Sequence, residues 1–489
     1  MDWQTLRVAE WLPDQPDLDN PGATVALNCF AAATSYKPIS SPENYSQATS
    51  ANNEVRGAHS IKNSAGQAYV YAGDAGKLYQ LSATGWNDIS VAGAYSGTST
   101  QEVWKFADYG PNMVIATNYN NSPQKIVPGS AAVALGGSPP RARYVAQVRD
   151  WVVLANLNDG TARSNRVQWS GYNNAEYWTR DVALQSDYQD LYEGGAVTGL
   201  GPADGGCVVV QESAAQFMSY AGPPVTWAFN KFANALGSKT PGSVVSHNNR
   251  VWWWGESDIW QYTAGQCIPI GAEKVARTLL SDFDQSYAYR VRSAVDPING
   301  LVLWAYPGTN HNGGIPNKLA VYAYNVGKWT VCELEVIELF QFLSAGITLE
   351  GLDALSASID ALSASLDSTV YMGGQYAFAC FSTTNKLQTF TGTPLSAVID
   401  TAELRAQPGR FTEITNTRPL YEGGTARVRI GRRKAQTDPL SWTAAKEVNA
   451  SGECNFRTNS RFTRARLELS GNWTQAIGID AYMRVSGTR

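Results

Sequence analysis

The sequence predicts an all-β fold: a six- or seven-bladed β-propeller with a short inserted segment, followed by a C-terminal extension that resembles a β-sandwich. Three observations lead to this prediction. A six-residue apolar phrase occurs seven times, an alternating phrase follows most of its copies, and the chain of 489 residues is 11% aromatic but only 16% charged. Such a composition is typical of a large chain rich in β-strands.

The apolar phrase combines β-branched and aromatic residues and is bounded by Gly, Asn and Asp, which is the pattern of a buried strand. Its copies are residues 68–73, 113–118, 151–156, 207–212, 251–256, 301–306 and 376–381. Their starting positions step by 45, 38, 56, 44, 50 and 75 residues. A recurrence of about 40 to 50 residues is the period of propeller blades.

The second phrase is a strand in which apolar and polar residues alternate. Its copies are residues 77–81, 215–220, 258–262, 318–324 and 386–390, and a tryptophan follows in four repeats, at Trp86, Trp178, Trp227 and Trp329. A buried strand, an alternating strand and an aromatic residue on the next strand form a repeating antiparallel sheet. Radial packing of such sheets hides their edges. A long β-sandwich or a β-helix is the alternative.

The order of these patterns predicts three regions. Residues 1–60 form an irregular N-terminal arm in which only residues 23–30 resemble a strand, residues 61–398 form the propeller with an insertion at 336–369, and residues 399–489 form a basic C-terminal β region.

The insertion places leucine and isoleucine at alternating spacings of three and four, which corresponds to two heptads of an amphipathic helix. Its apolar positions are Leu352, Leu355, Ile359, Leu362 and Leu366. The high serine content weakens a helix, so a long ordered loop is equally open. We expect this segment to pack on a neighbouring subunit. The aspartates at seven-residue spacing lack the glycine-containing loop of a calcium site, which favours a solvated face.

Arginine alternates with apolar residues in the C-terminal region, in the expected strands 426–430 and 462–469, and a further strand is expected at 476–485. This alternation places the guanidinium groups on one sheet face. From residue 403 onward the chain has 15 Lys and Arg against 8 Asp and Glu, a balance of +7, whereas the remainder has 23 against 34, a balance of −11. Complementary fields of this kind suit assembly, although they also keep a large particle soluble. The candidate contacts to another subunit or to DNA are Arg427, Arg429, Arg432, Arg433 and Lys434.

Sequence signatures of catalysis are missing. The three histidines, at positions 59, 247 and 311, lack flanking residues that suggest a nucleophilic site, and no GxSxG, HExxH or phosphate-binding glycine loop occurs. The six cysteines are scattered without a CxxC pair, as expected of reduced core residues. We therefore expect no enzyme activity, no cofactor and no metal, although acidic pairs that meet only in space stay open. No secretory signal and no membrane segment are expected.

Several stretches are similar to the tail nozzle proteins of tailed bacteriophages, the group that includes the packaged-DNA stabilisation proteins, or tail accessory factors, of short-tailed phages. The similar stretches are residues 166–170 with 173–178, residues 365–368 before Gly373 and Gly374, and residues 464–473. The order of parts is similar too. The Leu/Ser/Asp insertion departs from the family pattern.

The resemblance implies a structural virion protein, assembled in the bacterial cytoplasm and located in the tail. Copies would form a homo-oligomeric ring, a hexamer, that extends the DNA-exit channel and helps to retain the packaged genome. Its partners would be the adaptor or head-to-tail connector protein above, a tail needle, fibre or plug protein below, and genomic double-stranded DNA bound without sequence preference.

Two other functions stay open. The first is a tail-tip propeller that binds a receptor or glycan on Trp252, Trp253, Trp254 and Trp260, although the alternation of side chains along a strand directs part of this set to the core. The second is a propeller hydrolase acting on a receptor polysaccharide.

Overall fold

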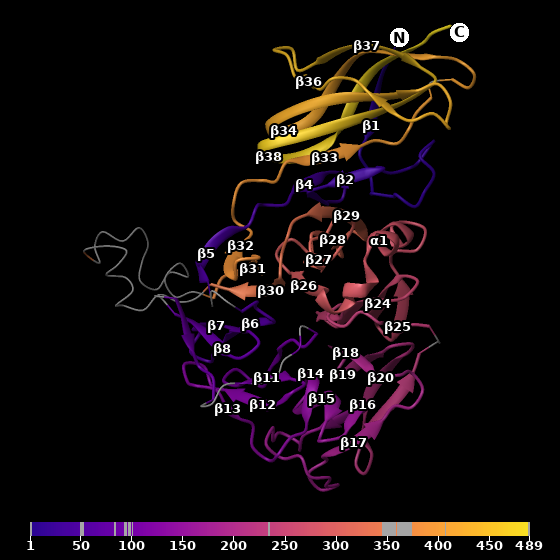
Figure 1. Ribbon diagram of the computed structural model, residues 1–489. Coiled ribbons are helices and arrows are strands. Elements are labelled where there is room, and N and C mark those ends of the chain that lie inside the picture. Colours follow the sequence, from indigo (N-terminus) through magenta and orange to yellow (C-terminus); the bar gives the residue numbers. More distant parts are fainter. Residues whose placement is uncertain are drawn as a thin grey trace.

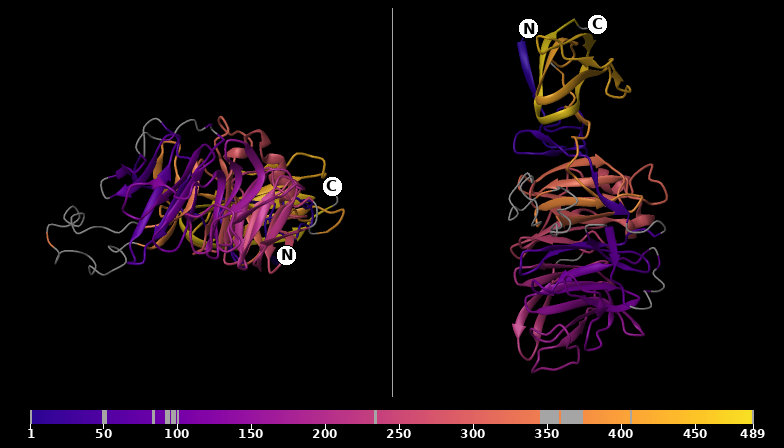
Figure 2. Two further views of the ribbon diagram at one scale, coloured as in Figure 1. Left: turned by 90° about the horizontal axis from the view of Figure 1, so that it is seen from below. Right: turned by 90° about the vertical axis from the view of Figure 1, so that its left-hand side faces the viewer.

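The computed structural model describes residues 2–48, 53–82, 85–91, 95, 99, 101–232, 235–344, 358, 374–405 and 407–487. Within these residues the chain is nearly all β, with one short α-helix, α1 (Ala276–Asp282), and one 3-10 helix, η1 (Gln285–Arg290). The all-β prediction is therefore confirmed. Figure 1 shows two parts, a ring of small sheets and a C-terminal β region that stands on one side of it, and Figure 2 shows that the molecule is elongated along the line joining them.

Seven sets of four antiparallel strands follow one another in the described part of the chain. The first three sets are β6 (Ala58–Lys62), β7 (Ala68–Gly73), β8 (Leu78–Ser82) and β9 (Gly85–Asp88); β10 (Lys105–Asp108), β11 (Val114–Asn118), β12 (Asn121–Ile126) and β13 (Val133–Ala134); and β14 (Arg141–Val148), β15 (Trp151–Asn158), β16 (Ala162–Trp169) and β17 (Asp187–Asp190). The fourth and fifth are β18 (Val197–Ala203), β19 (Gly206–Gln211), β20 (Ala215–Gly222) and β21 (Thr226–Lys231), then β22 (Val245–His247), β23 (Arg250–Trp254), β24 (Ile259–Thr263) and β25 (Gln266–Pro269). The sixth and seventh are β26 (Arg292–Asp296), β27 (Leu301–Tyr306), β28 (Lys318–Ala323) and β29 (Lys328–Glu333), then β30 (Glu338–Leu343), β31 (Tyr376–Phe381), β32 (Lys386–Thr389) and β5 (Glu43–Ala48).

Each of the seven apolar phrases is the second strand of its set, as the recurrence predicted. This strand lies between two neighbouring strands and has other sheets on both faces, so it is buried on both sides and reads as a continuous apolar run. In β23, for example, Val251, Trp252, Trp253 and Trp254 are all at most 1% exposed. The alternating phrases are the third strands.

The sets form a closed cycle through their first strands. Each first strand contacts the next, in the order β6, β10, β14, β18, β22, β26 and β30, and β30 contacts β6. The seventh set is completed by a segment from the beginning of the chain, because β5 pairs with β32 through Gln388 opposite Asn44 and Lys386 opposite Ala48. Hydrogen bonds between segments more than 300 residues apart therefore join the two ends of the cycle.

The repeat tryptophans pack between sets, as expected. Trp86 contacts Phe381 of the seventh set, Trp227 contacts Trp151 of the third, and Trp329, which is fully buried, stacks on Trp304 and donates its Nε1–H to the Ile270 carbonyl at 2.8 Å. Trp178 differs, because it lies in the connection between β16 and β17 instead of on a strand.

The C-terminal region is one curled sheet, a half-barrel, and the expected sandwich-like pair of sheets is wrong in this respect. Two long strands, β34 (Thr412–Arg433) and β38 (Phe462–Val485), pair along their whole length. On the outer side of β34 lie β35 (Ser441–Trp442), β36 (Lys446–Glu447) and β37 (Cys454–Ser460). On the outer side of β38 lie β1 (Asp2–Arg7) and β33 (Ala397–Asp400).

Glycines at matching positions let both long strands turn the same corner. Gly423 and Gly424 of β34 have φ of 68° and 61°, and Gly471 of β38 has φ of 72°. The register shifts at this point, and a Cβ at Gly424 would lie 2.4 Å from the Ser470 carbonyl oxygen. Only glycine tolerates both the left-handed backbone and this close approach. The two long strands therefore continue through the corner as one sheet.

The first sixty residues are not an irregular arm, because they pair with distant strands. Besides β1 and β5, they contain β2 (Val25–Leu27), β3 (Cys29–Ala31) and β4 (Tyr36–Pro38). Strand β2 lies between β33 and β29 and so links the C-terminal sheet to the sixth set, as Figure 1 shows. The strand expected at 23–30 is present as β2 and β3, whereas β1, β4 and β5 were not predicted, because their partners are mostly distant in sequence.

The predicted boundary of the insertion, 336–369, starts too early in the sequence. Residues 338–343 are β30, a strand of the closed cycle. The heptad positions and the aspartates lie outside the described residues.

Candidate functional site

The arginine row of the C-terminal sheet is the site that the sequence singled out. On β34 the side chains of Ala426, Val428 and Ile430 are buried in the shared core, and Arg427 and Arg429 point to the other face. The alternation therefore positions the guanidinium groups as predicted.

The partners of these arginines are carboxylates of the same chain. The Arg427 guanidinium lies 2.6 Å from Glu447, and the Arg429 guanidinium lies 2.6 Å from Glu468 on β38. Arg427 and Glu447 are both mostly exposed, so this ion pair contributes little to stability. Neither arginine therefore offers an unpaired charge to another molecule.

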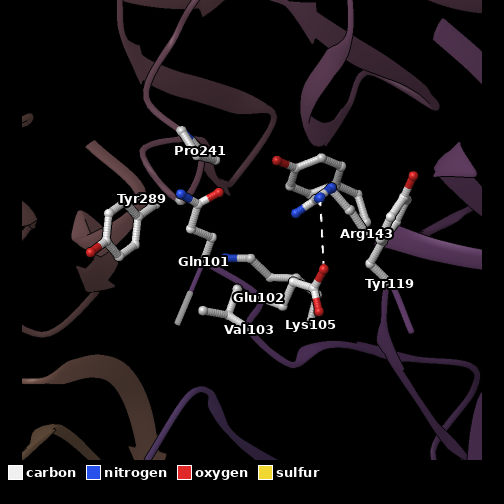
Figure 3. Close-up of a pocket in the computed structure, with 10 residues that line it drawn as sticks. Gln101, Glu102, Val103, Lys105, Tyr119, Arg143, Pro241 and Tyr289 are labelled. Atoms are coloured by element: carbon white, nitrogen blue, oxygen red, sulfur yellow. Dashed lines mark ion pairs between the residues drawn. The ribbon is translucent and has the colours of Figure 1, made fainter. Parts of the chain in front are cut away.

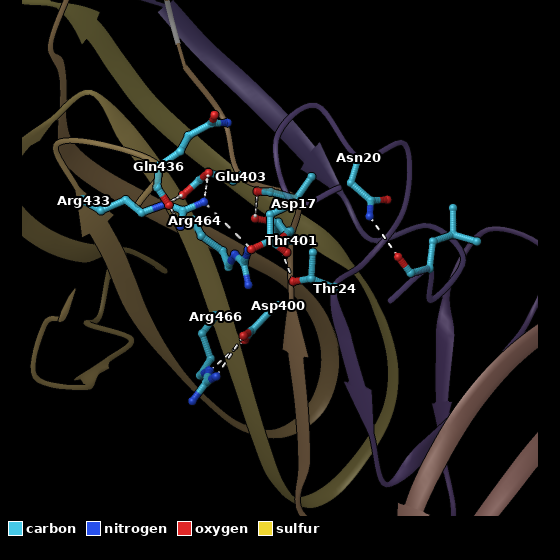
Figure 4. A network of polar contacts seen from close by, with 12 residues as sticks. Asp17, Asn20, Thr24, Asp400, Thr401, Glu403, Arg433, Gln436, Arg464 and Arg466 are labelled. Atoms are coloured by element: carbon cyan, nitrogen blue, oxygen red, sulfur yellow. Dashed lines mark hydrogen bonds and ion pairs between the residues drawn. The ribbon is translucent and has the colours of Figure 1, made fainter. Parts of the chain in front are cut away.

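Three arginines and three carboxylates form a largely buried network, which we call the carboxylate clasp: Asp17, Asp400, Glu403, Arg433, Arg464 and Arg466 (Figure 4), of which only Asp17, 49% exposed at its side chain, belongs to the N-terminal segment. The Glu403 side chain is fully buried and accepts two hydrogen bonds from Arg433, each at 2.6 Å. Such bidentate, charge-assisted pairs are the strong ones.

The Asp400–Arg466 pair repeats this bidentate geometry, whereas the Asp17–Arg464 pair is a single contact. Asp400, whose side chain is 1% exposed, accepts hydrogen bonds at 2.7 and 2.8 Å from Arg466, and Asp17 lies 2.8 Å from Arg464. The bond to Glu403 raises the pKa of the Arg433 guanidinium, and the bond to Asp400 raises that of Arg466.

The clasp fastens residues 12–24 to the C-terminal sheet. Backbone bonds run from the Glu403 N–H to the Asp17 carbonyl at 2.9 Å and from the Asp19 N–H to the Glu403 carbonyl at 3.2 Å. The Thr24 hydroxyl adds a bond to the Thr401 carbonyl at 3.2 Å. Arg433, one of the five candidate contact residues, therefore has a structural role within the subunit.

The remaining two candidates, Arg432 and Lys434, are exposed and have no ion pair with a carboxylate in the part of the chain that the structure describes. They lie close to two other cations in the same condition, Arg410 and Arg461. We call these four residues the basic corner.

The curl of the sheet creates the basic corner. Arg433 at the end of β34 pairs with Phe462, whereas Thr412 at its beginning pairs with Ser460, and residue 461 lies between these two partners. Both ends of β34 are thereby brought to the same turn. Arg461 also lies over the Phe411 ring, with its Cζ 5.4 Å from the ring centroid. Sequence reasoning missed Arg410 and Arg461, because no local signal marks them.

Two of the three histidines contact aspartates of the same chain. His59 pairs with Asp108 at 2.6 Å and His311 with Asp284 at 2.9 Å, so both are tied within the fold. The six cysteines form no disulfide, and burial raises the pKa of the Cys207 thiol to about 12. Across the described ranges, no group of three or more His, Cys, Asp or Glu side chains is placed to hold a metal ion. No helix in the same ranges is long and apolar enough to cross a membrane.

The tryptophans considered for glycan binding are not available as surface platforms. Trp252, Trp253 and Trp254 are at most 1% exposed, and Trp260 is half-buried. Aromatic side chains do reach the surface elsewhere, around β17 and the β20–β21 turn. These are Tyr172, Tyr188, Tyr192 and Tyr220, with exposed fractions from 37% to 82%.

Comparisons with known proteins give little. No family model matches the chain, and no curated protein matches it. Two crystal structures of a B. thetaiotaomicron protein, described as the extracellular domain of a candidate one component system and of a candidate hybrid two component system, are similar with TM-scores of 0.42 and identities of 11% and 12%. Each match covers 82% of this chain and 47% of the other, so the chain spans about half the length of these structures. A similarity of this size carries no argument about fold or function.

Proposed function

We propose that this protein is a structural subunit of a bacteriophage tail, which assembles into a homo-oligomeric ring around the path of the exiting genome. The proposal starts from the resemblance of residues 166–178 and 464–473 to tail nozzle proteins. The observation that carries it is the basic corner, four exposed cations without carboxylate partners in the described chain, on a protein whose remainder is acidic.

The proposal also covers the arrangement of the seven four-stranded sets. We infer that the closed cycle of seven four-stranded sets is a seven-bladed β-propeller. Support comes from the contacts between successive first strands and from β5, which completes the seventh set with a strand from the other end of the cycle. A closed propeller leaves only short, protected sheet edges, so it suits a rigid body that keeps its shape in an assembly.

Charge supplies the attraction between subunits. The C-terminal region carries +7 and the rest of the chain −11, and eight of its arginines, from Arg405 to Arg484, are already paired with carboxylates of the same chain. The basic corner is therefore a free positive surface that can meet the acidic body of a neighbouring copy. Complementary charges of this kind orient subunits and speed their encounter.

The separation of an acidic body from a basic C-terminal region also suits a DNA channel. Each cation that contacts a phosphate adds salt-dependent affinity, so a wall rich in Lys and Arg would hold the genome back. An acidic body leaves the wall weakly interacting. We expect duplex DNA to bind weakly and without sequence preference, because the described ranges contain no α-helix longer than the seven residues of α1 that could read a groove.

The experiment replaces the basic corner. A variant with Arg410→Gln, Arg432→Gln, Lys434→Gln and Arg461→Gln should remain folded and fail to form the ring that the wild type forms at low salt, measured by mass photometry. The matched control, Arg418→Gln with Arg427→Gln, Arg429→Gln and Arg484→Gln, removes four cations that already have partners in the chain. It should assemble.

Three results would count against the proposal: a wild-type chain that stays monomeric at every salt and protein concentration, equal assembly of the two variants, or tight, sequence-selective and salt-resistant DNA binding.

The exposed tyrosines favour a second candidate function, the binding of a receptor glycan. Tyr172 and Tyr220 pack on Trp151 and stay partly exposed, and the Arg166 guanidinium lies 3.7 Å from the Tyr188 ring centroid. Exposed, well-supported aromatic rings suit stacking on a sugar. A glycan array probed with the wild type and with Tyr172→Ala/Tyr188→Ala tests it, and a silent array would exclude this function.

A further inference from the structure

A small cavity lies near the first strands of several sets of the closed cycle. It is separate from the carboxylate clasp and from the basic corner. It has about 350 Å³ of empty space counted to its mouth. It is lined from the second and third sets by Gln101, Glu102, Val103, Lys105, Tyr119, Arg143 and Tyr144, and from the segments before β22 and β26 by Pro241, Gly242 and Tyr289 (Figure 3). Because the second and third sets do not neighbour the fifth and sixth in the cycle, these segments share one cavity only near its centre.

Two cations and one carboxylate line this central cavity. Arg143 lies 3.8 Å from Glu102, and its Cζ lies 4.1 Å from the Tyr119 ring centroid. Glu102 also accepts a hydrogen bond from the Asn120 amide. The carboxylate is thus partnered twice, which leaves the lining with one surplus positive charge.

Lys105 provides that surplus. Its ammonium group makes no hydrogen bond or ion pair among the described residues, although it is the first residue of the inner strand β10 and crosses the cavity (Figure 3). Its carboxylate neighbour Glu338 is already bonded to Arg292 at 2.8 Å, and both of these side chains are buried. Burial lowers the pKa of Lys105, Arg292 lowers it further, and Glu338 opposes the change. A desolvated cation without a partner is unfavourable unless an anion joins it.

We propose that the central cavity binds a compact monoanionic ligand through a carboxylate, with Lys105 and Arg143 as the charged contacts. The single surplus charge matches one carboxylate, and Glu102 would repel a dianion. The phenol rings of Tyr119, Tyr144 and Tyr289 supply walls for a ring-sized body. The 350 Å³ include solvent at the open mouth, so the enclosed part of the cavity is small, which limits the ligand to a single carboxylate-bearing unit and excludes a polymer.

The proposal is independent of ring assembly and of DNA, and it is tested on the full chain. The probe is D-glucuronate, compared with glucose as the neutral ring, acetate as the isolated carboxylate and sulfate as the dianion, all at constant ionic strength. Isothermal titration calorimetry should detect glucuronate, and acetate more weakly, and it should detect no glucose. Glucuronate should also raise the melting temperature.

Variants locate the site. Lys105→Met keeps the length of the side chain and removes an unpartnered charge, so it should fold at least as well as the wild type and lose glucuronate affinity by tenfold or more. Arg143→Gln should lose affinity too. The control is Lys77→Met, since Lys77 is a partly exposed lysine that pairs with Asp88 at 2.6 Å on the first set, and it should bind as the wild type does.

Binding of glucose as strongly as glucuronate, stronger binding of sulfate, no binding of any carboxylate, or unchanged affinity in the folded Lys105→Met variant would each overturn the proposal.

Discussion

Replacement of Glu403 by glutamine tests how much the carboxylate clasp contributes to the stability of the fold. The substitution keeps the shape of the side chain and removes its charge, so the Arg433 guanidinium loses its two hydrogen bonds of 2.6 Å to a carboxylate. Glu403 is fully buried and Arg433 is 14% exposed at its side chain. Water therefore cannot replace the lost partner well.

The expected cost follows from this burial. Removing one member of a buried ion pair destabilises a protein by about 3–5 kcal/mol. Asp17 lies 3.9 Å from Arg433 and compensates part of the charge, so we expect a loss near the lower end, about 3 kcal/mol. The control is Glu447→Gln, which breaks the exposed pair with Arg427 and should cost about 0–1 kcal/mol.

Urea unfolding followed by tryptophan fluorescence measures both changes in the free energy of unfolding. Trp442 and Trp473 report on the C-terminal region. A double variant with Arg433→Met, which removes the orphaned charge, should recover part of the loss. Equal effects of Glu403→Gln and Glu447→Gln, or a double variant no more stable than Glu403→Gln, would refute the reasoning.

Three further predictions rest on other parts of the fold. Trp329→Ala should destabilise the protein by about 3–5 kcal/mol in the same urea assay, because Trp329 is fully buried between sets; a loss under about 1 kcal/mol would contradict this packing. The six cysteines should react slowly with a thiol reagent at pH 8 in the folded protein and fully in urea, because their thiols are free and burial raises the pKa of each, to about 12 for Cys207, Cys267, Cys332 and Cys380; rapid modification of the folded protein would contradict this burial. Asp284→Asn should flatten the loss of melting temperature between pH 5 and pH 2.5, because bonds from Ser286 and His311 lower the pKa of Asp284 to about 2. A carboxyl group with a lowered pKa stabilises the fold above its unfolded pKa of about 3.9 and loses that contribution as the pH falls toward 2, so an unchanged slope in the variant would be the contrary result.

The repeated strands could be predicted from the sequence because their signal is local. A strand covered on both faces must be apolar throughout, and this requirement marks β7, β11, β15, β19, β23, β27 and β31 wherever they occur. The alternation of arginine with apolar residues likewise predicts which face of β34 is buried, since the period of a strand is two. Trp329 could be predicted as a packing residue by the same reasoning.

Only the tertiary structure decided which distant residues meet. The pairing of β5 with β32, the basic corner at Arg410 and Arg461, and the central cavity at Lys105 all join segments whose separation in sequence leaves no local pattern. The sequence also placed Arg433 in a row of contact residues, whereas Glu403, from the segment after β33, lies against Arg433 and is its partner. A strand's period determines the face of each side chain, but register, glycine corners and the closure of the cycle determine its partner, and these depend on backbone pairings across hundreds of residues.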